Sequence, residues 1–295
     1  MEFNEFRNKV KEALPDFLTD DLRNAEIKDT AVNKLQGESY SGISVTPEGS
    51  RGGVSINLED AFLDYQTGDQ FTAVMNRLAD TLVGTLGERE QFDIGFLSDY
   101  SAVKEMLTME VVGKDQNAEM LQYVPHQEME DLAAVYRIDL GETENGNATV
   151  LITNEMLRNY GLTPDQLHKD ALDAAQHTMK YSIRSMDEVL TRMAQSMGID
   201  QEQPVMFSSP LYVATTERDM YGAGVLAVPS FFEDAAAKLD GNFYVLPSSV
   251  HELLLLPDRL ATEHHLLKAT VQDANANEVE PQERLYDTGY HYTAT

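Results

Sequence analysis

Two apolar runs on either side of a glycine-bounded turn predict an antiparallel hairpin in the middle of this chain. The first run spans Leu132 to Leu140 and the second Ala148 to Thr153, and the turn between them begins at Gly141 and ends at Gly146. Strands joined by a short turn pair antiparallel, whereas parallel strands need a crossover of a dozen or more residues. We therefore expect a fold that contains an antiparallel sheet.

The first third of the chain predicts a second hairpin between helices. Apolar and polar residues alternate at Ile43 to Val45 and at Val54 to Ile56, around a loop rich in glycine, which is typical of paired strands. Two amphipathic helices are indicated by apolar residues that recur every three or four positions. These residues are Phe3, Phe6, Val10, Leu14 and Phe17 before the hairpin, and Phe71, Val74, Leu78 and Leu82 after it.

The rest of the chain mixes short strands with capped helices. Asn154 is the predicted cap of a short helix, and Thr163 with Pro164 predicts the start of a longer one. Strands are predicted at four places, and they are Leu211 to Thr215, Gly222 to Val228, Phe243 to Leu246 and Leu253 to Leu256. Since helices and strands follow one another without regular crossovers, we predict an α+β fold with mainly antiparallel mixed sheets flanked by helices.

Two domains are predicted from this order of elements. The first is an N-terminal helix, hairpin and helix region at residues 1–120, and the second is a C-terminal α+β domain at residues 121–295. An internal break could also lie at residues 198–210, where the segment is acidic and punctuated by proline.

Charge limits the kinds of partner. The chain has 50 Asp and Glu against 22 Lys and Arg, a formal net charge of −28. This sign repels phosphate backbones, so direct nucleic-acid binding is not expected, and a basic protein would be attracted. The chain contains no cysteine, which suits a reducing cytoplasm. No apolar run approaches the roughly 18 residues that a membrane span needs, so we expect a cytoplasmic protein.

Five segments of the chain have a distinctive sequence, and they are Tyr123-Val-Pro-His126, Met129 to Tyr136, Gly222-Ala-Gly-Val-Leu226, Phe243 to Glu252 and Asn275 to Val279. Together they resemble an uncharacterised bacterial family, a domain of unknown function that is common in Gram-positive gut anaerobes and on their mobile elements. The likeness covers nearly the whole chain, and Leu246-Pro-Ser-Ser-Val-His-Glu252 is its most specific part. The family usually has an Asn-Thr pair where this chain has His177-Thr178. The resemblance implies no activity, cofactor or catalytic residue.

Five residues are candidates for catalysis on chemical grounds. They are His126, Asp131, Ser249, His251 and Glu252. If the two segments that carry them converge, a hydroxyl of Ser248 or Ser249, an imidazole and a carboxylate could form a nucleophile, a base and an orienting group. The alternative interpretation is that the serines are turn or cap residues and that His251 is an ordinary hydrogen-bonded side chain.

No pattern in the chain predicts a metal or cofactor site. His126, Asp131, His251 and Glu252 are permissible metal ligands, but no His-x-x-x-His or Glu-x-x-His pair places two ligands on one helix face. The glycines at Gly222 and Gly224 are too few for a dinucleotide-binding loop. We therefore expect neither a metal nor a cofactor.

Three functions stay open at this point. The favoured one is a non-enzymatic protein-binding or regulatory factor that contacts another protein, which could be a basic one. A second is a mobile-element inhibitor whose carboxylates imitate nucleic acid and occupy a basic groove as a decoy. The third is a hydrolase with a His/Ser/Asp site at the five candidate residues.

Overall fold

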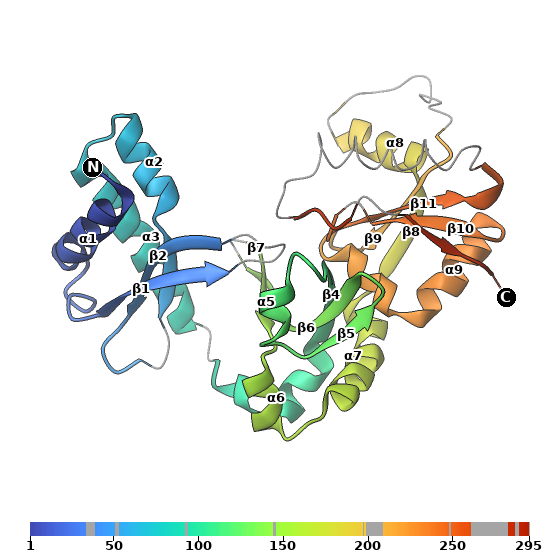
Figure 1. Ribbon diagram of the computed structural model, residues 1–295, viewed down its shortest axis with the longest axis horizontal. Helices are drawn as coiled ribbons and strands as arrows, with labels where there is room; N and C mark the ends of the chain where they lie inside the picture. Colours follow the sequence, from blue (N-terminus) through green and yellow to red (C-terminus); the bar gives the residue numbers. More distant parts are fainter. Residues whose placement is uncertain are drawn as a thin grey trace. The chain divides into compact units, whose positions relative to one another are not determined.

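The chain divides into two compact units, Met1–Gly95 and Phe96–Thr295. The computed structural model describes residues 1–33, 39–50, 53–91, 94–143, 146–196, 198, 209–247, 249–260, 283–286 and 289–294 (Figure 1). The domain boundary predicted near residue 120 falls within the second unit, because strand β4 (Leu107–Gly113) pairs with β6 (Leu132–Thr143). The break predicted at 198–210 lies mostly outside the described residues.

In its described residues, the first unit combines three helices with a three-stranded antiparallel sheet. In chain order its elements are α1 (Phe3–Ala13), the 3-10 turn η1 (Leu14–Asp16), β1 (Glu26–Asn33), β2 (Ser39–Thr46), β3 (Val54–Asn57), α2 (Glu59–Thr67) and α3 (Phe71–Gln91). The predicted hairpin is confirmed as β2 and β3, in which Ile43 lies opposite Ile56 and Val45 opposite Val54. Strand β1 extends the sheet on the other side of β2.

The core of the first unit follows the predicted helical spacing. Phe6, Val10 and Leu14 are fully buried, and their side chains lie on one face because residues three and four apart share a helix face. Phe6 packs against Phe62 of α2 with 5.3 Å between ring centroids. The apolar face of α3 also joins this core, through Val74, Leu78 and Leu82.

In the second unit, the residues that the structure describes form two antiparallel sheets. Its helices are α4 (Tyr100–Val103), α5 (Ala118–Leu121), α6 (Asn154–Tyr160), α7 (Pro164–Thr178), α8 (Met186–Ser196) and α9 (Pro229–Leu239), with 3-10 turns η4 (Lys104–Met106), η5 (Gly222–Ala227) and η6 (Asp258–Leu260). The further strands are β5 (His126–Met129), β7 (Gly146–Leu151), β8 (Tyr181–Ser185), β9 (Tyr212–Thr216), β10 (Phe243–Leu246), β11 (Leu253–Pro257) and β12 (Tyr290–Tyr292). The 3-10 turn η3 (Ile94–Ser98) spans the boundary between the units.

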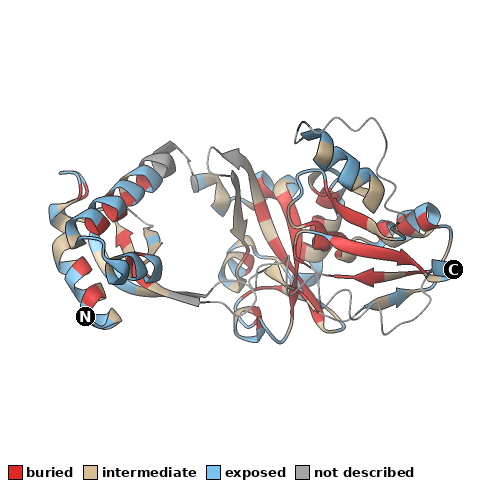
Figure 2. Cartoon of the chain, turned by 90° about the horizontal axis from the view of Figure 1, so that it is seen from above, coloured by how far each residue is buried: buried red, intermediate tan, exposed pale blue. Residues whose placement is uncertain are grey.

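The strand order confirms the predicted α+β class. One sheet has the order β4-β6-β5, with β7 also paired to β6, and the other has the order β12-β10-β11-β9-β8. Every pairing between these strands is antiparallel. The predicted central hairpin is β6 and β7, and its register shifts between Asp139 and Gly141. Figure 2 shows that buried residues are concentrated along the strands of this unit.

Two threonines begin the helices that follow the hairpin. Thr163 accepts a hydrogen bond from the backbone N–H of Gln166 at 3.2 Å, with Pro164 at the first helical position of α7, as predicted. For α6 the cap is Thr153, whose hydroxyl accepts from Met156 N–H at 3.2 Å, and the prediction of Asn154 was wrong by one residue. Both hydroxyls satisfy backbone donors that the first turn of a helix leaves unpaired.

The strand predicted at Gly222 to Val228 is instead the 3-10 turn η5. A Cβ atom at Gly224 would collide with the backbone oxygen of Met109, and one at Gly222 with that of His251. The small residues allow close packing, but the backbone N–H of Gly222 donates to His251 O at 3.0 Å from a turn and not from a strand. A run of small residues does not distinguish these two conformations, because both bring backbone close to a neighbour.

Within the described residues, no helix has the length and apolar character to span a membrane.

Candidate functional site

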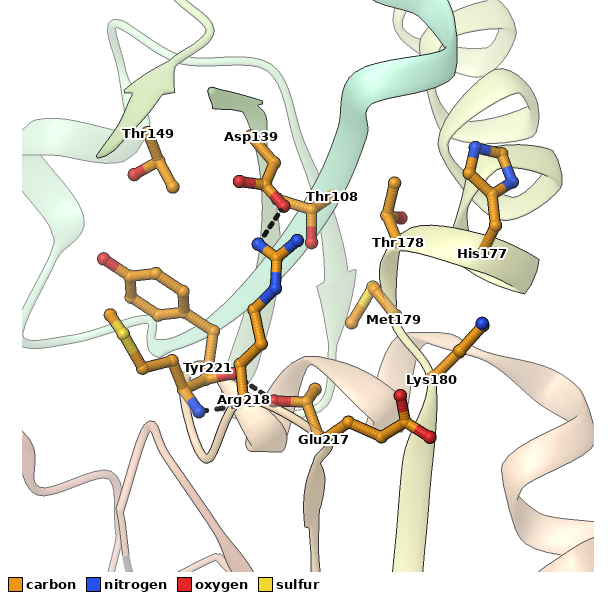
Figure 3. Close-up of a pocket in the computed structure, with 12 residues that line it drawn as sticks. Thr108, Asp139, Thr149, His177, Thr178, Met179, Lys180, Glu217, Arg218 and Tyr221 are labelled. Carbon is orange, nitrogen blue, oxygen red and sulfur yellow. Dashed lines mark hydrogen bonds and ion pairs between the residues drawn. The ribbon is translucent and has the colours of Figure 1, made fainter. Parts of the chain in front are cut away.

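A polar pocket of about 220 Å³ lies within the second unit. Side chains from four parts of the fold line it, as Figure 3 shows. They are Thr108, Asp139 and Thr149 from β4, β6 and β7; His177 and Thr178 at the end of α7, with Met179 and Lys180 after it; Thr216 at the end of β9; and Glu217, Arg218, Met220 and Tyr221 in the turn that follows. We call this set the polar pocket.

The turn between β9 and η5 has an unusual backbone. Asp219 and Tyr221 have φ values of 52° and 51°, in the left-handed region that residues with a Cβ seldom adopt, at a cost of about 1–2 kcal/mol each. Hydrogen bonds hold the turn in place. The Thr216 hydroxyl donates to Met220 O at 2.6 Å, and Tyr221 N–H donates to His251 Nδ1 at 3.2 Å. The turn therefore presents Arg218 and Tyr221 to the pocket in a fixed conformation.

Arg218 is oriented by a carboxylate across the pocket. Its Nη1 donates to Asp139 Oδ2 at 2.6 Å. The other oxygen of Asp139 accepts from the backbone N–H of Gly141 at 2.9 Å, so this carboxylate is itself fixed. The Asp139 side chain is 12% exposed and that of Arg218 is 45% exposed. The guanidinium is thus positioned while part of it stays accessible.

A buried ion pair supports one side of the polar pocket. Arg137 Nε donates to Glu110 Oε2 at 2.5 Å, and its Nη1 donates to Thr149 Oγ1 at 2.9 Å. The guanidinium also lies 5.3 Å from the centroid of the Tyr221 ring. Glu110 is fully buried, and this loss of water raises its pKa even though the charge of Arg137 opposes the shift. The pair fixes the position of Thr149 and Tyr221.

Three of the five predicted catalytic residues share the loop between β10 and β11. Ser249 is 5% exposed, and its hydroxyl accepts from the backbone N–H groups of His251 at 3.2 Å and Glu252 at 3.1 Å. His251 Nδ1 accepts from Tyr221, which leaves the proton on Nε2, 3.4 Å from Glu283 Oε1. Burial of the Glu252 carboxylate, together with the nearby charge of Asp219, raises the pKa of Glu252. Ser249 thus acts as a loop cap.

The other two predicted residues lie on β5 and in the turn after it. His126 Nδ1 donates to the carbonyl oxygen of Val124 at 3.1 Å, and Asp131 accepts a hydrogen bond from the Tyr290 hydroxyl. None of the five residues lines either of the two pockets described here. Within the described part of the chain, no hydrogen bond or ion pair joins His126 or Asp131 to the loop of Ser249. Ser248 lies outside the described residues. A catalytic role for the five stays a prediction.

The residues of the polar pocket did not stand out in the sequence, apart from His177. His177 Nε2 donates to Glu105 O at 2.8 Å. One signal did exist beside the pocket, since Glu110 interrupts the apolar run Leu107 to Val112. A charged residue within such a run is either exposed or paired in the interior. Arg218 carried no comparable signal, because its place depends on a strand and turn distant from Asp139 in sequence.

An apolar pocket of about 260 Å³ lies elsewhere in the second unit. It is lined by Met129, Glu130, Leu132, Leu226, Phe232, Val245, Tyr290, His291 and Tyr292, which we call the apolar pocket. Phe232 of α9 stacks on Tyr292 of β12 with 5.1 Å between ring centroids, and Phe243 lies 5.1 Å from the same tyrosine. The stacked rings of Phe232 and Tyr292 therefore form one wall of the apolar pocket.

Two carboxylates lie beside the apolar pocket. Glu130 is one of its lining residues, in the left-handed region with φ of 53°. Asp131 accepts from the hydroxyl of Tyr290, another lining residue. Burial, and then the bond to Asp131, raise the pKa of Tyr290, so this tyrosine keeps its proton. The pocket therefore combines an apolar lining with adjacent negative charge.

Among the described residues, no cluster of three or more His, Asp or Glu could hold a metal ion.

The residues that line both pockets lie within the part of the chain that a family model matches. No curated protein and no solved structure matches this chain. The family model that does match is described as a family of unknown function, DUF5688, and the match covers residues 3–294. The resemblance to an uncharacterised family is confirmed by this match. Because the match spans nearly the full length, this chain belongs to DUF5688, a family of unknown function.

Proposed function

We propose that this chain is a non-enzymatic binding factor that contacts a basic protein through the apolar pocket. The observation that carries the proposal is the pairing of an apolar lining with Glu130 and Asp131 beside it. Burying one apolar side chain of a partner contributes about 1.5–3 kcal/mol. Lys or Arg residues that flank that side chain would meet the two carboxylates. The chain contains no cysteine, which is consistent with our proposal that it meets its partner in the reducing cytoplasm.

The charge of the whole chain supports the same kind of partner. A net charge of −28 attracts a basic protein over distances longer than a contact and raises the rate of encounter. The apolar pocket then supplies what long-range attraction cannot, namely a preferred place to bind. β12 is the outermost strand of its sheet among the described residues. An extended segment of the partner could therefore add main-chain hydrogen bonds next to the pocket.

A titration with three labelled peptides of equal length tests this proposal. One peptide alternates lysine and leucine, a second alternates glutamate and leucine, and a third alternates lysine and serine. We expect the lysine–leucine peptide to bind most tightly, and the lysine–serine peptide about tenfold or more weaker, because it lacks the apolar anchor. Binding of the lysine–leucine peptide should weaken with salt, since the Debye length falls from about 10 Å at 0.1 M to about 3 Å at 1 M.

Matched variants locate the binding. Changing Glu130→Gln together with Asp131→Asn removes both charges, and the amide oxygen introduced at the second position can still accept a hydrogen bond from Tyr290. We expect about threefold to tenfold weaker binding of the lysine–leucine peptide. The control changes Glu12→Gln and Asp16→Asn, two exposed carboxylates of the first unit, and removes the same charge. Equal losses in both double variants, or equal affinity for the lysine–serine peptide, would contradict docking at the apolar pocket.

Those contrary results would favour the alternative function, that of a decoy that imitates nucleic acid. A mobile-element inhibitor that imitates nucleic acid would use carboxylates spread over its surface, so every acidic residue removed would weaken binding by a similar amount. The mobile-element setting itself stays a prediction from the resemblance.

The hydrolase alternative has less support. Ser249 is largely buried and its hydroxyl already caps a loop, whereas a nucleophile must reach a substrate and its base. His126→Ala and His251→Ala variants test it, because loss of a hydrolytic activity in both would favour a shared site.

A further inference from the structure

The polar pocket contains charges of both signs. Asp139 and Glu217 are acidic, and Lys180 and Arg218 are basic. Figure 3 shows Arg218 extended toward Asp139, with Lys180 and Glu217 on the side near the end of α7. Asp139 and Arg218 are bonded to each other. Within the described part of the chain, neither the Lys180 ammonium nor the Glu217 carboxylate has a hydrogen-bond or ion-pair partner. One cation and one anion are thus available to a ligand.

Hydroxyl groups add to these charges. Thr149 Oγ1 accepts from Arg137 Nη1 at 2.9 Å, so its own O–H remains able to donate to a ligand oxygen. By contrast, Thr178 and Thr216 donate to the backbone oxygens of Leu107 at 2.8 Å and Met220 at 2.6 Å. Their hydroxyl protons are already used. The available donors of the pocket therefore include Lys180, the exposed part of Arg218 and Thr149.

The charge pattern selects between classes of ligand. A purely anionic ligand would face Asp139 and Glu217 and would also be repelled by the net charge of −28. A purely cationic ligand would face Lys180 and Arg218. A ligand with both charges and no net charge can satisfy both sets of side chains. At about 220 Å³, the pocket is also smaller than the roughly 300–1,000 Å³ of sites for drug-sized ligands.

We propose that the polar pocket binds a small zwitterion of the amino-acid class. Lys180 and the exposed part of Arg218 hold its carboxylate, and Glu217 holds its ammonium group. Asp139 keeps Arg218 in place, and the strained turn that carries Arg218 and Tyr221 keeps the binding groups preorganised, which lowers the cost of ordering them on binding. The proposal concerns a different pocket from the protein-binding proposal and does not depend on it.

Calorimetric titration of the full chain with free amino acids tests the proposal. For each amino acid that binds, its amide lacks the carboxylate and its N-acetyl form lacks the ammonium group. We expect both derivatives to bind about tenfold to hundredfold more weakly, because each loses a hydrogen bond to a charged group. Inorganic phosphate and glucose serve as an anion and a neutral polyol, and neither should bind at this pocket.

Two exposed residues allow variants that keep the fold intact. Lys180→Met and Glu217→Gln each remove one charge from the pocket, and we expect each to weaken amino-acid binding about tenfold or more. The matched control is Lys169→Met, an exposed lysine on α7 that does not line the pocket, and it should leave the affinity unchanged. Equal losses in Lys169→Met and Lys180→Met would overturn the proposal. So would binding of phosphate or glucose in place of amino acids, or no binding of any amino acid.

Discussion

The two units fill their interiors in different ways. In the first unit, no polar or charged residue is buried as a whole among the described residues, although the Nε atom of Arg7 is buried. The second unit holds all the buried polar residues that the structure describes, and these are Thr108, Glu110, Asn117, Asp170, Thr215, Thr216 and Ser249. A buried polar group costs free energy unless it is bonded, and a core can be built without such groups, as the first unit illustrates. Both pockets are lined by residues of the second unit only. Both binding sites that we propose therefore lie in the second unit.

The largest effect is expected at the buried ion pair. Arg137→Met leaves the Glu110 carboxylate buried without its cation, and should lower the free energy of unfolding by about 3–5 kcal/mol. Glu110→Leu combined with Arg137→Met removes both charges and should restore most of that loss, because the two apolar side chains need no partner. Urea denaturation of both variants measures this. A double variant as unstable as Arg137→Met alone would contradict the interpretation of a costly buried charge.

A core substitution in the first unit sharpens the contrast. Met75 is fully buried in its apolar core, so Met75→Ala should lower the free energy of unfolding by about 2–4 kcal/mol through lost contacts and a cavity. Binding of the lysine–leucine peptide and of amino acids should not change at temperatures where the variant is folded. A tenfold loss of either affinity would mean that the first unit takes part in binding.

Two glycines should respond to alanine in opposite directions. A Cβ at Gly222 would meet the backbone oxygen of His251, so Gly222→Ala should cost about 1–3 kcal/mol through overpacking beside the polar pocket. Gly84 lies in helix α3 with nothing within 4 Å of an added Cβ, so Gly84→Ala should stabilise by up to about 1 kcal/mol through helix propensity. Thermal or urea unfolding compares them, and effects of the same sign would count against the close approach at Gly222.

The smallest effect is a pH dependence at Asp170. Its oxygens accept from Tyr100 OH at 2.6 Å, Gln166 Nε2 at 2.9 Å and Lys104 Nζ at 2.9 Å. Burial acts to raise the pKa of Asp170, but these bonds outweigh burial and lower it. The folded state therefore favours the ionised form, and the resulting stability is present above about pH 4 and lost as the pH falls through the lower folded pKa.

The variant Asp170→Asn isolates that contribution. At pH 7 it should be about 1 kcal/mol less stable than the unaltered chain, and the difference should shrink as the pH is lowered below about 4. Urea denaturation at a series of pH values measures the difference. A constant difference at every pH would mean that the carboxylate contributes through packing alone.

Local patterns in the sequence predicted local structure. The hairpin of β6 and β7 and the buried faces of α1 and α3 follow from alternation and helical spacing, which depend only on near neighbours. The turn η5 was misjudged because its small residues are held by the distant backbone of His251 and Met109. Both pockets also escaped prediction, since strands and turns far apart in the sequence bring their residues together. Their chemistry depends on tertiary pairing, such as Arg218 with Asp139.

Hydrogen exchange of the full chain with the lysine–leucine peptide bound tests the central claim most directly. If a basic partner docks at the apolar pocket, backbone amides should gain protection at residues 126–132 and 289–294, with little change in the first unit. Protection spread over both units would contradict the claim, because it would mean that net charge, and not a site in the second unit, holds the partner.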